Sequence, residues 1–247
     1  MADIFTALKP HFYLGQHDVC LNLAFAHLKS FPDDVRVWEF VGVIYSEQGQ
    51  WLKAARAFEE ASLIAPISDY SRVCLADVYG ELGRHELTRS LLNRVASRED
   101  IDWRILRRVA SGLDKYGFSR DALQQARRII ERLPDEGQAY YDAAYYAIRS
   151  GELFCTAVGL ARKAVTLSPN NILFRVGLAT ILFSHGQPKD AYEPVRRFEQ
   201  ADYEVIECTC CLERLKSIME AAGDLRQVQT ITRRLQGLTS TGGHSHA

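Results

Sequence analysis

The pattern of apolar and polar residues between positions 38 and 66 predicts two helices joined by a turn. The first apolar face has spacings of three, one and three residues and consists of Trp38, Val41, Gly42 and Tyr45. The second face has spacings of four and three residues and consists of Ala54, Phe58 and Ala61. Such spacings place the members of each set on one side of a helix. Gly49 separates the two sets and Pro66 follows the second, so the stretch predicts a helical hairpin.

Glycine recurs along the chain with a fixed period. Intervals of 34 residues separate Gly15, Gly49, Gly83, Gly117 and Gly151, and intervals of 35 and 37 residues then lead to Gly186 and Gly223. A fixed period of this size is typical of stacked repeats. We expect each glycine in a tight turn between two antiparallel helices, where a residue without Cβ is easiest to accommodate. After Gly151 the small apolar positions are displaced by one residue, which predicts an insertion in that turn.

The stretch from 38 to 66 resembles the tetratricopeptide repeat, whose pattern is Trp-x2-Leu-Gly-x2-Tyr, then Ala-x3-Phe, then Pro. Every position of that pattern is matched, with Val41 in place of Leu. The resemblance covers about residues 1–236 and is strongest from 35 to 186. It implies an all-α fold, a right-handed superhelical solenoid of stacked antiparallel helix hairpins. A column of small residues then serves helix packing, namely Gly42, Ala76, Ala110, Ala144 and Ala179.

The resemblance also implies a domain organisation. One domain is expected over residues 1–236, with repeats near 1–34, 35–68, 69–102, 103–136, 137–171, 172–206 and 207–236. In the sixth repeat, Ala191 and Val195 are expected on one face of a second helix. Residues 237–247 have little apolar content, so they are predicted to form a disordered tail.

Composition narrows the functional classes. The formal net charge of the 247 residues is −1, so no overall field attracts nucleic acid or an anionic membrane. The chain has no run of eighteen apolar residues, and its N-terminal stretch lacks an apolar signal core. The sequence therefore predicts a cytoplasmic protein that binds no nucleic acid and inserts into no membrane. Its six cysteines are expected to be reduced.

The resemblance implies an inner, concave surface lined by the first helix of each repeat. On these helices we predict eight partner-binding residues: Asp77, Glu81, Arg104, Arg107, Arg108, Tyr141, Tyr145 and Arg149. Guanidinium forks and tyrosine rings suit a peptide that carries a carboxylate or an aromatic side chain. The alternative is that these charges form a solvated face or pair with neighbouring acids.

A Cys-x-Cys-Cys cluster, Cys208, Cys210 and Cys211, is the strongest candidate for metal chemistry. Three thiols suit a soft metal, and His244 or His246 offers a further ligand. A structural zinc site, however, normally uses four ligands at Cys-x-x-Cys spacing, which this cluster lacks. We therefore expect buried small side chains here, and no metal or cofactor.

Catalytic motifs are lacking from the sequence. It contains no GxSxG, no HExxH and no phosphate-binding glycine loop, and its histidines are scattered and predicted to lie at the surface. We predict that the chain is not an enzyme but a protein–protein interaction scaffold or adaptor, which binds a peptide or protein in the concave groove. Membership of a larger complex is compatible with this role. Two alternatives remain open: an assembly or secretion chaperone with one dominant client, and a metal-binding or redox protein that uses the cysteine cluster.

Overall fold

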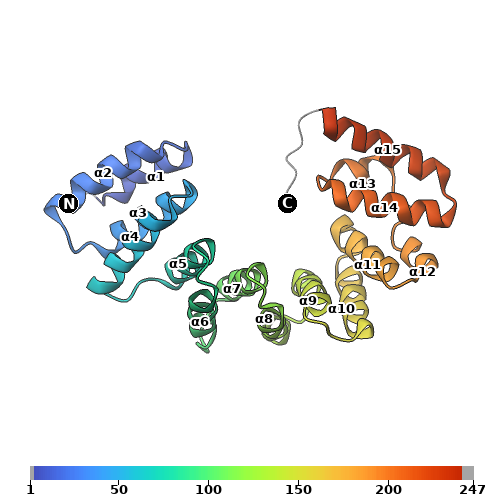
Figure 1. Ribbon diagram of the computed structural model, residues 1–247, viewed down its shortest axis with the longest axis horizontal. Coiled ribbons are helices and arrows are strands. Elements are labelled where there is room, and N and C mark those ends of the chain that lie inside the picture. Colours follow the sequence, from blue (N-terminus) through green and yellow to red (C-terminus); the bar gives the residue numbers. More distant parts are fainter. Residues whose placement is uncertain (1–2, 241–247) are drawn as a thin grey trace. The chain divides into compact units, whose positions relative to one another are not determined.

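The computed structural model describes residues 3–240, and over this range it consists of fifteen α-helices without a strand (Figure 1). The helices of the first half are α1 (Phe5–Tyr13), α2 (His17–Ser30), α3 (Val35–Glu47), α4 (Trp51–Ile64), α5 (Asp69–Glu81), α6 (His85–Ala96), α7 (Trp103–Lys115) and α8 (Ser119–Arg132). Those of the second half are α9 (Gly137–Arg149), α10 (Phe154–Leu167), α11 (Ile172–Ser184), α12 (Pro188–Tyr192), α13 (Gln200–Glu204), α14 (Thr209–Ala222) and α15 (Leu225–Ser240). The all-α prediction is confirmed.

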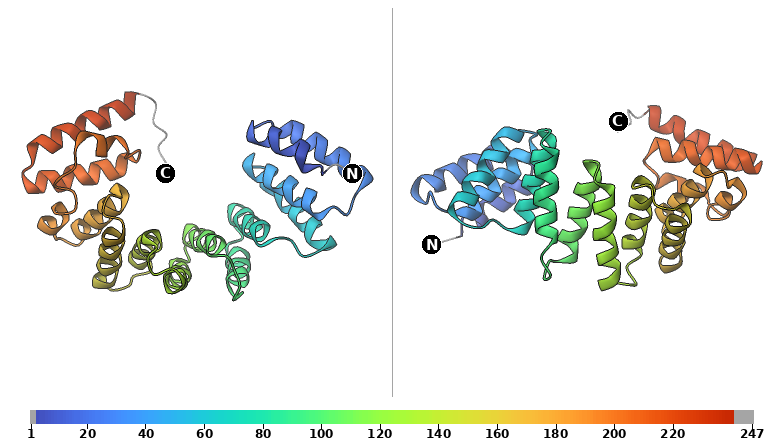
Figure 2. Two further views of the ribbon diagram at one scale, coloured as in Figure 1. Left: turned by 180° about the vertical axis from the view of Figure 1, so that it is seen from behind. Right: turned by 60° about the horizontal axis from the view of Figure 1, so that its bottom comes forward.

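The chain divides into two compact units. The first comprises Met1–Gln125 and the second Ala126–Ala247, so the boundary falls within α8. Within each unit, helices that follow one another pair as antiparallel hairpins, such as α3 with α4 and α9 with α10 (Figure 2). The prediction of one continuous domain over 1–236 stays a prediction.

Glycines with a left-handed backbone connect the two helices of each hairpin. In the described residues, positive φ angles occur at Gly15, Gly49, Gly83, Gly117, Gly151, Gly186 and Gly223, the seven positions that the period of the sequence singles out. A side chain at such a φ is strained, which explains why glycine occupies the turns. The helix after Gly151 begins three residues later, at Phe154, whereas the helix after Gly49 begins two residues later, at Trp51. The predicted one-residue insertion is therefore confirmed.

Polar residues begin the first helix of several hairpins. The Asp102 carboxylate accepts a hydrogen bond from the backbone N–H of Arg104 at 2.7 Å, and the Asn171 side chain accepts one from Phe174 at 3.3 Å. The Ser68 hydroxyl does the same for the Ser71 N–H at 3.2 Å. These bonds satisfy N–H groups that have no partner within the helix, and they fix where each helix starts.

Close packing between helices explains the small residues at the hairpin interfaces. At Gly42 in α3, an added Cβ would lie 2.8 Å from the Phe58 ring of α4, closer than real Cβ atoms come. Phe58, Val41 and Ile44 are fully buried there. The prediction that Gly42 serves packing is thus confirmed, because α3 and α4 approach closely only while this position lacks a side chain.

The sixth repeat departs from the prediction. Ala191 and Val195 are both fully buried as expected, but helix α12 ends at Tyr192 after five residues. Pro194 lies between them and has no N–H to donate, so the helix does not continue. The Pro194 carbonyl instead accepts a hydrogen bond from Nε of Arg175 at 2.7 Å. Residues 200–204 then form the separate short helix α13.

The last helix extends beyond its predicted end. Helix α15 continues to Ser240, so the prediction of a disordered tail from residue 237 is wrong for residues 237–240. Leu235 and Leu238 pack against the core of the second unit and extend the helix into this segment. The rest of the predicted tail, including His244 and His246, lies outside the described residues. Among residues 3–240, no helix combines the length and the apolar character that crossing a membrane requires.

Candidate functional site

The predicted arginine stripe is exposed on α7 in the first unit. Arg104, Arg107 and Arg108 all lie at the surface, and the guanidinium of Arg104 lies over the Trp103 ring at 4.7 Å. The guanidinium of Arg108 lies 4.6 Å from the ring centre of Tyr70, at the start of α5. Sequence analysis missed Tyr70, whose side chain is 41% exposed. The arginine stripe of α7 is thus joined to an aromatic ring on the neighbouring inner helix.

The two predicted acids on α5 are engaged with α7. Nζ of Lys115 lies 2.5 Å from the Glu81 carboxylate, which also accepts a hydrogen bond from the Tyr116 hydroxyl at 3.1 Å. The hydrogen bond from Lys115 lowers the pKa of Glu81. Asp77 is half-buried, and this burial raises its pKa although Lys115 and Arg108 oppose the effect. For Glu81 the interpretation as a paired charge is therefore the better one.

The three predicted residues of the second unit differ in their surroundings. Tyr141 on α9 stacks on Phe174 of α11 with ring centres 5.0 Å apart, and its ring covers Gly177, where an added Cβ would lie 2.4 Å away. Burial raises the pKa of Tyr141, in keeping with a packing contact. Tyr145 is 50% exposed, and the Arg149 guanidinium lies over its ring at 5.6 Å. Of these three residues, Tyr145 and Arg149 thus lie at the surface of the second unit.

An open hollow of about 570 Å³ lies across the inner helices α1, α3 and α5 of the first unit. Its aromatic wall consists of Phe5, Phe12, Phe40 and Tyr70, and its charged rim includes Lys9, Arg36, Glu39 and Glu47. The rings of Phe5 and Phe12 lie 5.6 and 5.3 Å from that of Phe40. Tyr70 lines the hollow and its ring also contacts the Arg108 guanidinium, so this residue links the hollow to α7.

The sequence contained a signal for this hollow. Tyr70 lies seven residues before the predicted residue Asp77, and Phe40 likewise lies seven residues before Glu47, an acid on the rim of the hollow. Positions seven apart share a helix face. Extending each inner stripe by two turns towards the helix start identifies both rings.

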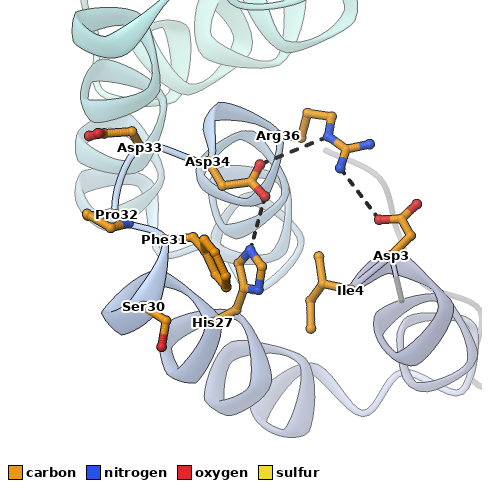
Figure 3. A pocket seen from close by; sticks show the side chains of 9 residues that line it. All are labelled: Asp3, Ile4, His27, Ser30, Phe31, Pro32, Asp33, Asp34 and Arg36. Atoms are coloured by element: carbon orange, nitrogen blue, oxygen red, sulfur yellow. Dashed lines mark hydrogen bonds and ion pairs between the residues drawn. The ribbon is translucent and has the colours of Figure 1, made fainter. Parts of the chain in front are cut away.

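A second hollow, of about 680 Å³, lies where α2 connects to α3 (Figure 3). Nε2 of His27 contacts the Asp34 carboxylate at 3.0 Å, and the ring of Phe31 stacks on His27 at 4.8 Å. Arg36 bridges Asp34 and Asp3 at 4.0 and 3.5 Å. Asp34 also begins α3, so these contacts fix the connection between two helices. His27 is half-buried here, which corrects the prediction of a surface histidine.

The three cysteines of the cluster come together at the start of α14. Their Sγ atoms all lie within 4.8 Å of one another, and those of Cys208 and Cys210 are 2.6 Å apart. Cys208 and Cys210 are exposed and Cys211 is half-buried, so the prediction of buried small side chains is wrong for the first two. Cys208 is exposed because it precedes the first turn of α14 and so lies outside the core. Burial raises the pKa of Cys211 to about 12.

Solved structures share this arrangement of helical hairpins. A tetratricopeptide-repeat protein from Parabacteroides merdae matches with a TM-score of 0.70 at 14% identity, over 95% of this chain and 91% of its own. This chain has the tetratricopeptide-repeat fold. The C-terminal part of a tetratricopeptide-repeat protein from Cytophaga hutchinsonii matches with a TM-score of 0.65 at 12% identity, over 96% of each chain. YrrB, a tetratricopeptide-repeat protein described as having an unusual peptide-binding site, matches with a TM-score of 0.55 at 18% identity, over 69% of this chain and 88% of its own.

Similarity in sequence to curated proteins is local, and no family model matches the chain. Superkiller protein 3 of Schizosaccharomyces pombe is 28% identical over 68 residues, which is 28% of this chain. Superkiller complex protein 3 of Mus musculus is 33% identical over 75 residues, which is 30% of this chain. Each match covers only 5% of the length of the relative. The tetratricopeptide-repeat fold therefore rests on the repeat pattern and the structural likeness.

Proposed function

We propose that this tetratricopeptide-repeat chain is a protein-interaction scaffold whose first unit binds an extended segment of a partner protein. The observation that carries the proposal is the position of Tyr70, which belongs to the aromatic hollow and also stacks with Arg108. An apolar or aromatic side chain of the partner fills the hollow, and a neighbouring carboxylate reaches the guanidinium groups of α7. The peptide-binding site described for YrrB supports this use of the fold.

The charges of the first unit favour an acidic partner segment. At the α7 end of the surface, Arg104 and Arg108 are exposed and offer the planar, bidentate geometry that carboxylates prefer. Glu39 on the rim is already engaged, because its carboxylate accepts a hydrogen bond from the backbone N–H of Ser68 at 2.6 Å. Glu81 is similarly paired with Lys115. The acids on this surface are therefore partly neutralised by the chain itself.

The second unit offers a smaller contact of the same chemistry. Tyr145 and Arg149 present an exposed aromatic ring with a guanidinium above it. We propose them as additional partner contacts, with Tyr141 supporting them from the packed interface between α9 and α11. A chaperone with one client would use the same surfaces, and the name of the mouse relative, a complex protein, favours membership of an assembly. A cytoplasmic location stays a prediction.

The test is selection of peptides displayed on phage against the purified chain. We expect enriched sequences that combine an aromatic or large aliphatic residue with Asp or Glu nearby. The double variant Tyr70→Ser with Arg108→Glu should lose binding of these peptides by more than about tenfold. Its helicity and melting temperature should barely change, because an exposed cation–π contact contributes only about 0.5–1 kcal/mol.

The matched control reverses two exposed arginines on the second helices of the same unit, Arg56→Glu on α4 with Arg94→Glu on α6. This variant reverses the charge of one arginine more than the test variant does, and it should still keep full peptide binding. Selection of peptides without acidic residues would contradict the proposal. Equal binding by a folded Tyr70/Arg108 variant would also contradict it and would show that the partner binds at a different surface.

A further inference from the structure

The cysteine cluster at the start of α14 is not part of the proposed partner-binding surface. Three thiols from four consecutive positions, 208–211, converge so that their Sγ atoms lie within 4.8 Å of one another. Two of them, Cys208 and Cys210, are exposed, which leaves an open approach from solvent. Among residues 3–240 this is the one group of three or more potential metal ligands that meets that distance.

The spacing of the sulfurs suits an ion bound by three thiolates. An ion at the centre of a sulfur triangle, with metal–sulfur bonds of about 2.3 Å as in zinc thiolates, holds the sulfurs about 4 Å apart. That separation is within the 4.8 Å limit of the cluster. The pair Cys208 and Cys210, now at 2.6 Å, has to move apart to reach this separation, and both side chains are exposed. Exposed side chains have room to move apart by rotation about χ1.

The number and type of ligands select the ion. Structural zinc takes four ligands, and the described part of the cluster supplies three. Thiolates are soft donors that favour Cu(I). The start of α14 carries the positive end of the helix dipole, and Arg214 follows Cys210 by one turn, so both offset the negative charge of three thiolates.

We propose that Cys208, Cys210 and Cys211 form a binding site for a soft monovalent metal ion, and that this ion is Cu(I). Binding converts three thiols and one Cu(I) ion into a tris-thiolate complex and releases three protons. The expectation of no metal at this cluster rested on a missing fourth ligand, which Cu(I) does not require. The site is independent of the aromatic hollow, because it lies in the second unit.

The test is an anaerobic titration of the reduced full chain with Cu(I), against a chromophoric Cu(I) chelator as competitor. We expect one ion per chain, three sulfur neighbours in the X-ray absorption spectrum of the bound copper, and tighter binding at higher pH. Cys210→Ser, a change at an exposed position, should weaken the affinity for Cu(I) by more than about 100-fold. This exceeds the roughly 10- to 100-fold that is typical when only a supporting group around a metal is lost.

The matched control is Cys155→Ser, which removes an exposed thiol on α10 of the same unit and should leave Cu(I) affinity unchanged. Circular dichroism of each variant checks that it folds. Unchanged Cu(I) affinity in folded Cys210→Ser, equal weakening by Cys155→Ser, or tighter binding of Zn(II) than of Cu(I) would each overturn the proposal.

Discussion

At Gly42 the absence of a side chain sets the distance between α3 and α4. We predict that Gly42→Leu destabilises the chain by about 1–3 kcal/mol, because the new side chain meets the buried Phe58 ring. The matched control is Gly159→Leu on α10, where an added Cβ has no neighbour within 4 Å. That change should be neutral or stabilise by up to about 1 kcal/mol through helix propensity. Urea denaturation measures both, and equal effects would refute the packing role of Gly42.

The half-buried carboxylate of Asp77 on α5 gives a dependence of stability on pH. Burial raises the pKa of Asp77 above its ordinary value of 3.8. Below that ordinary value Asp77 is protonated in both the folded and the unfolded chain, so burial of charge costs nothing. Above the folded pKa, the ionised group disfavours the folded state. Asp77→Asn should therefore stabilise the chain at pH 7, and the gain should vanish as the pH falls to about 3.5.

The control variant, at Glu81, should change stability at pH 7 in the opposite direction. Lys115 lowers the pKa of Glu81, so ionised Glu81 stabilises the folded state above its unfolded pKa. Glu81→Gln should destabilise the chain at pH 7, and the loss should disappear as the pH falls through the folded pKa. Urea denaturation of both variants and the parent at the two pH values checks the signs. If Asp77→Asn destabilises the chain at pH 7, the attraction of Lys115 and Arg108 outweighs the burial.

At the scale of a single helix, the start of α11 depends on one side chain. Oδ1 of Asn171 accepts a hydrogen bond from the Phe174 N–H at 3.3 Å. Asn171→Ala should lower the free energy of unfolding by about 1 kcal/mol, since it leaves that N–H without a capping partner. The preceding residue, Asn170, is exposed and supplies a matched control, so Asn170→Ala should change stability by less than about 0.5 kcal/mol. Similar losses for both variants in urea denaturation would show that the cap contributes nothing.

Elements differ in how well the sequence predicts them. The glycine turns and the apolar faces are local, so a period of 34 residues was enough to place the hairpins and even the insertion after Gly151. The break in the sixth repeat was missed because Ala191 and Val195 keep helical spacing across Pro194. Both side chains are buried all the same, which shows that spacing predicts burial more securely than it predicts a continuous helix.

Across the whole chain, the contacts that the sequence did not predict connect different helices. The stack of Arg108 on Tyr70 joins α7 to α5, and the hollow needs α1, α3 and α5 together. Such contacts depend on how helices cross, which a repeat pattern leaves undetermined. The predicted residues Asp77, Glu81, Arg104, Arg107 and Arg108 lie in the first unit, and Tyr141, Tyr145 and Arg149 in the second. Their shared role in binding a partner stays a prediction.

Tyr70 both lines the hollow and contacts Arg108, which has a consequence for how the proposed binding surface distinguishes partners. In the proposed function, a segment anchored in the hollow would keep a neighbouring carboxylate at high effective concentration beside Arg108, because Tyr70 lines the hollow and also contacts Arg108. In this proposal each contact alone would be weak and short-lived, whereas a ligand that makes both contacts would have to break both before it leaves. If the proposed function is right, we expect the first unit to discriminate by residence time: it should quickly release any segment that carries only the apolar group or only the acid.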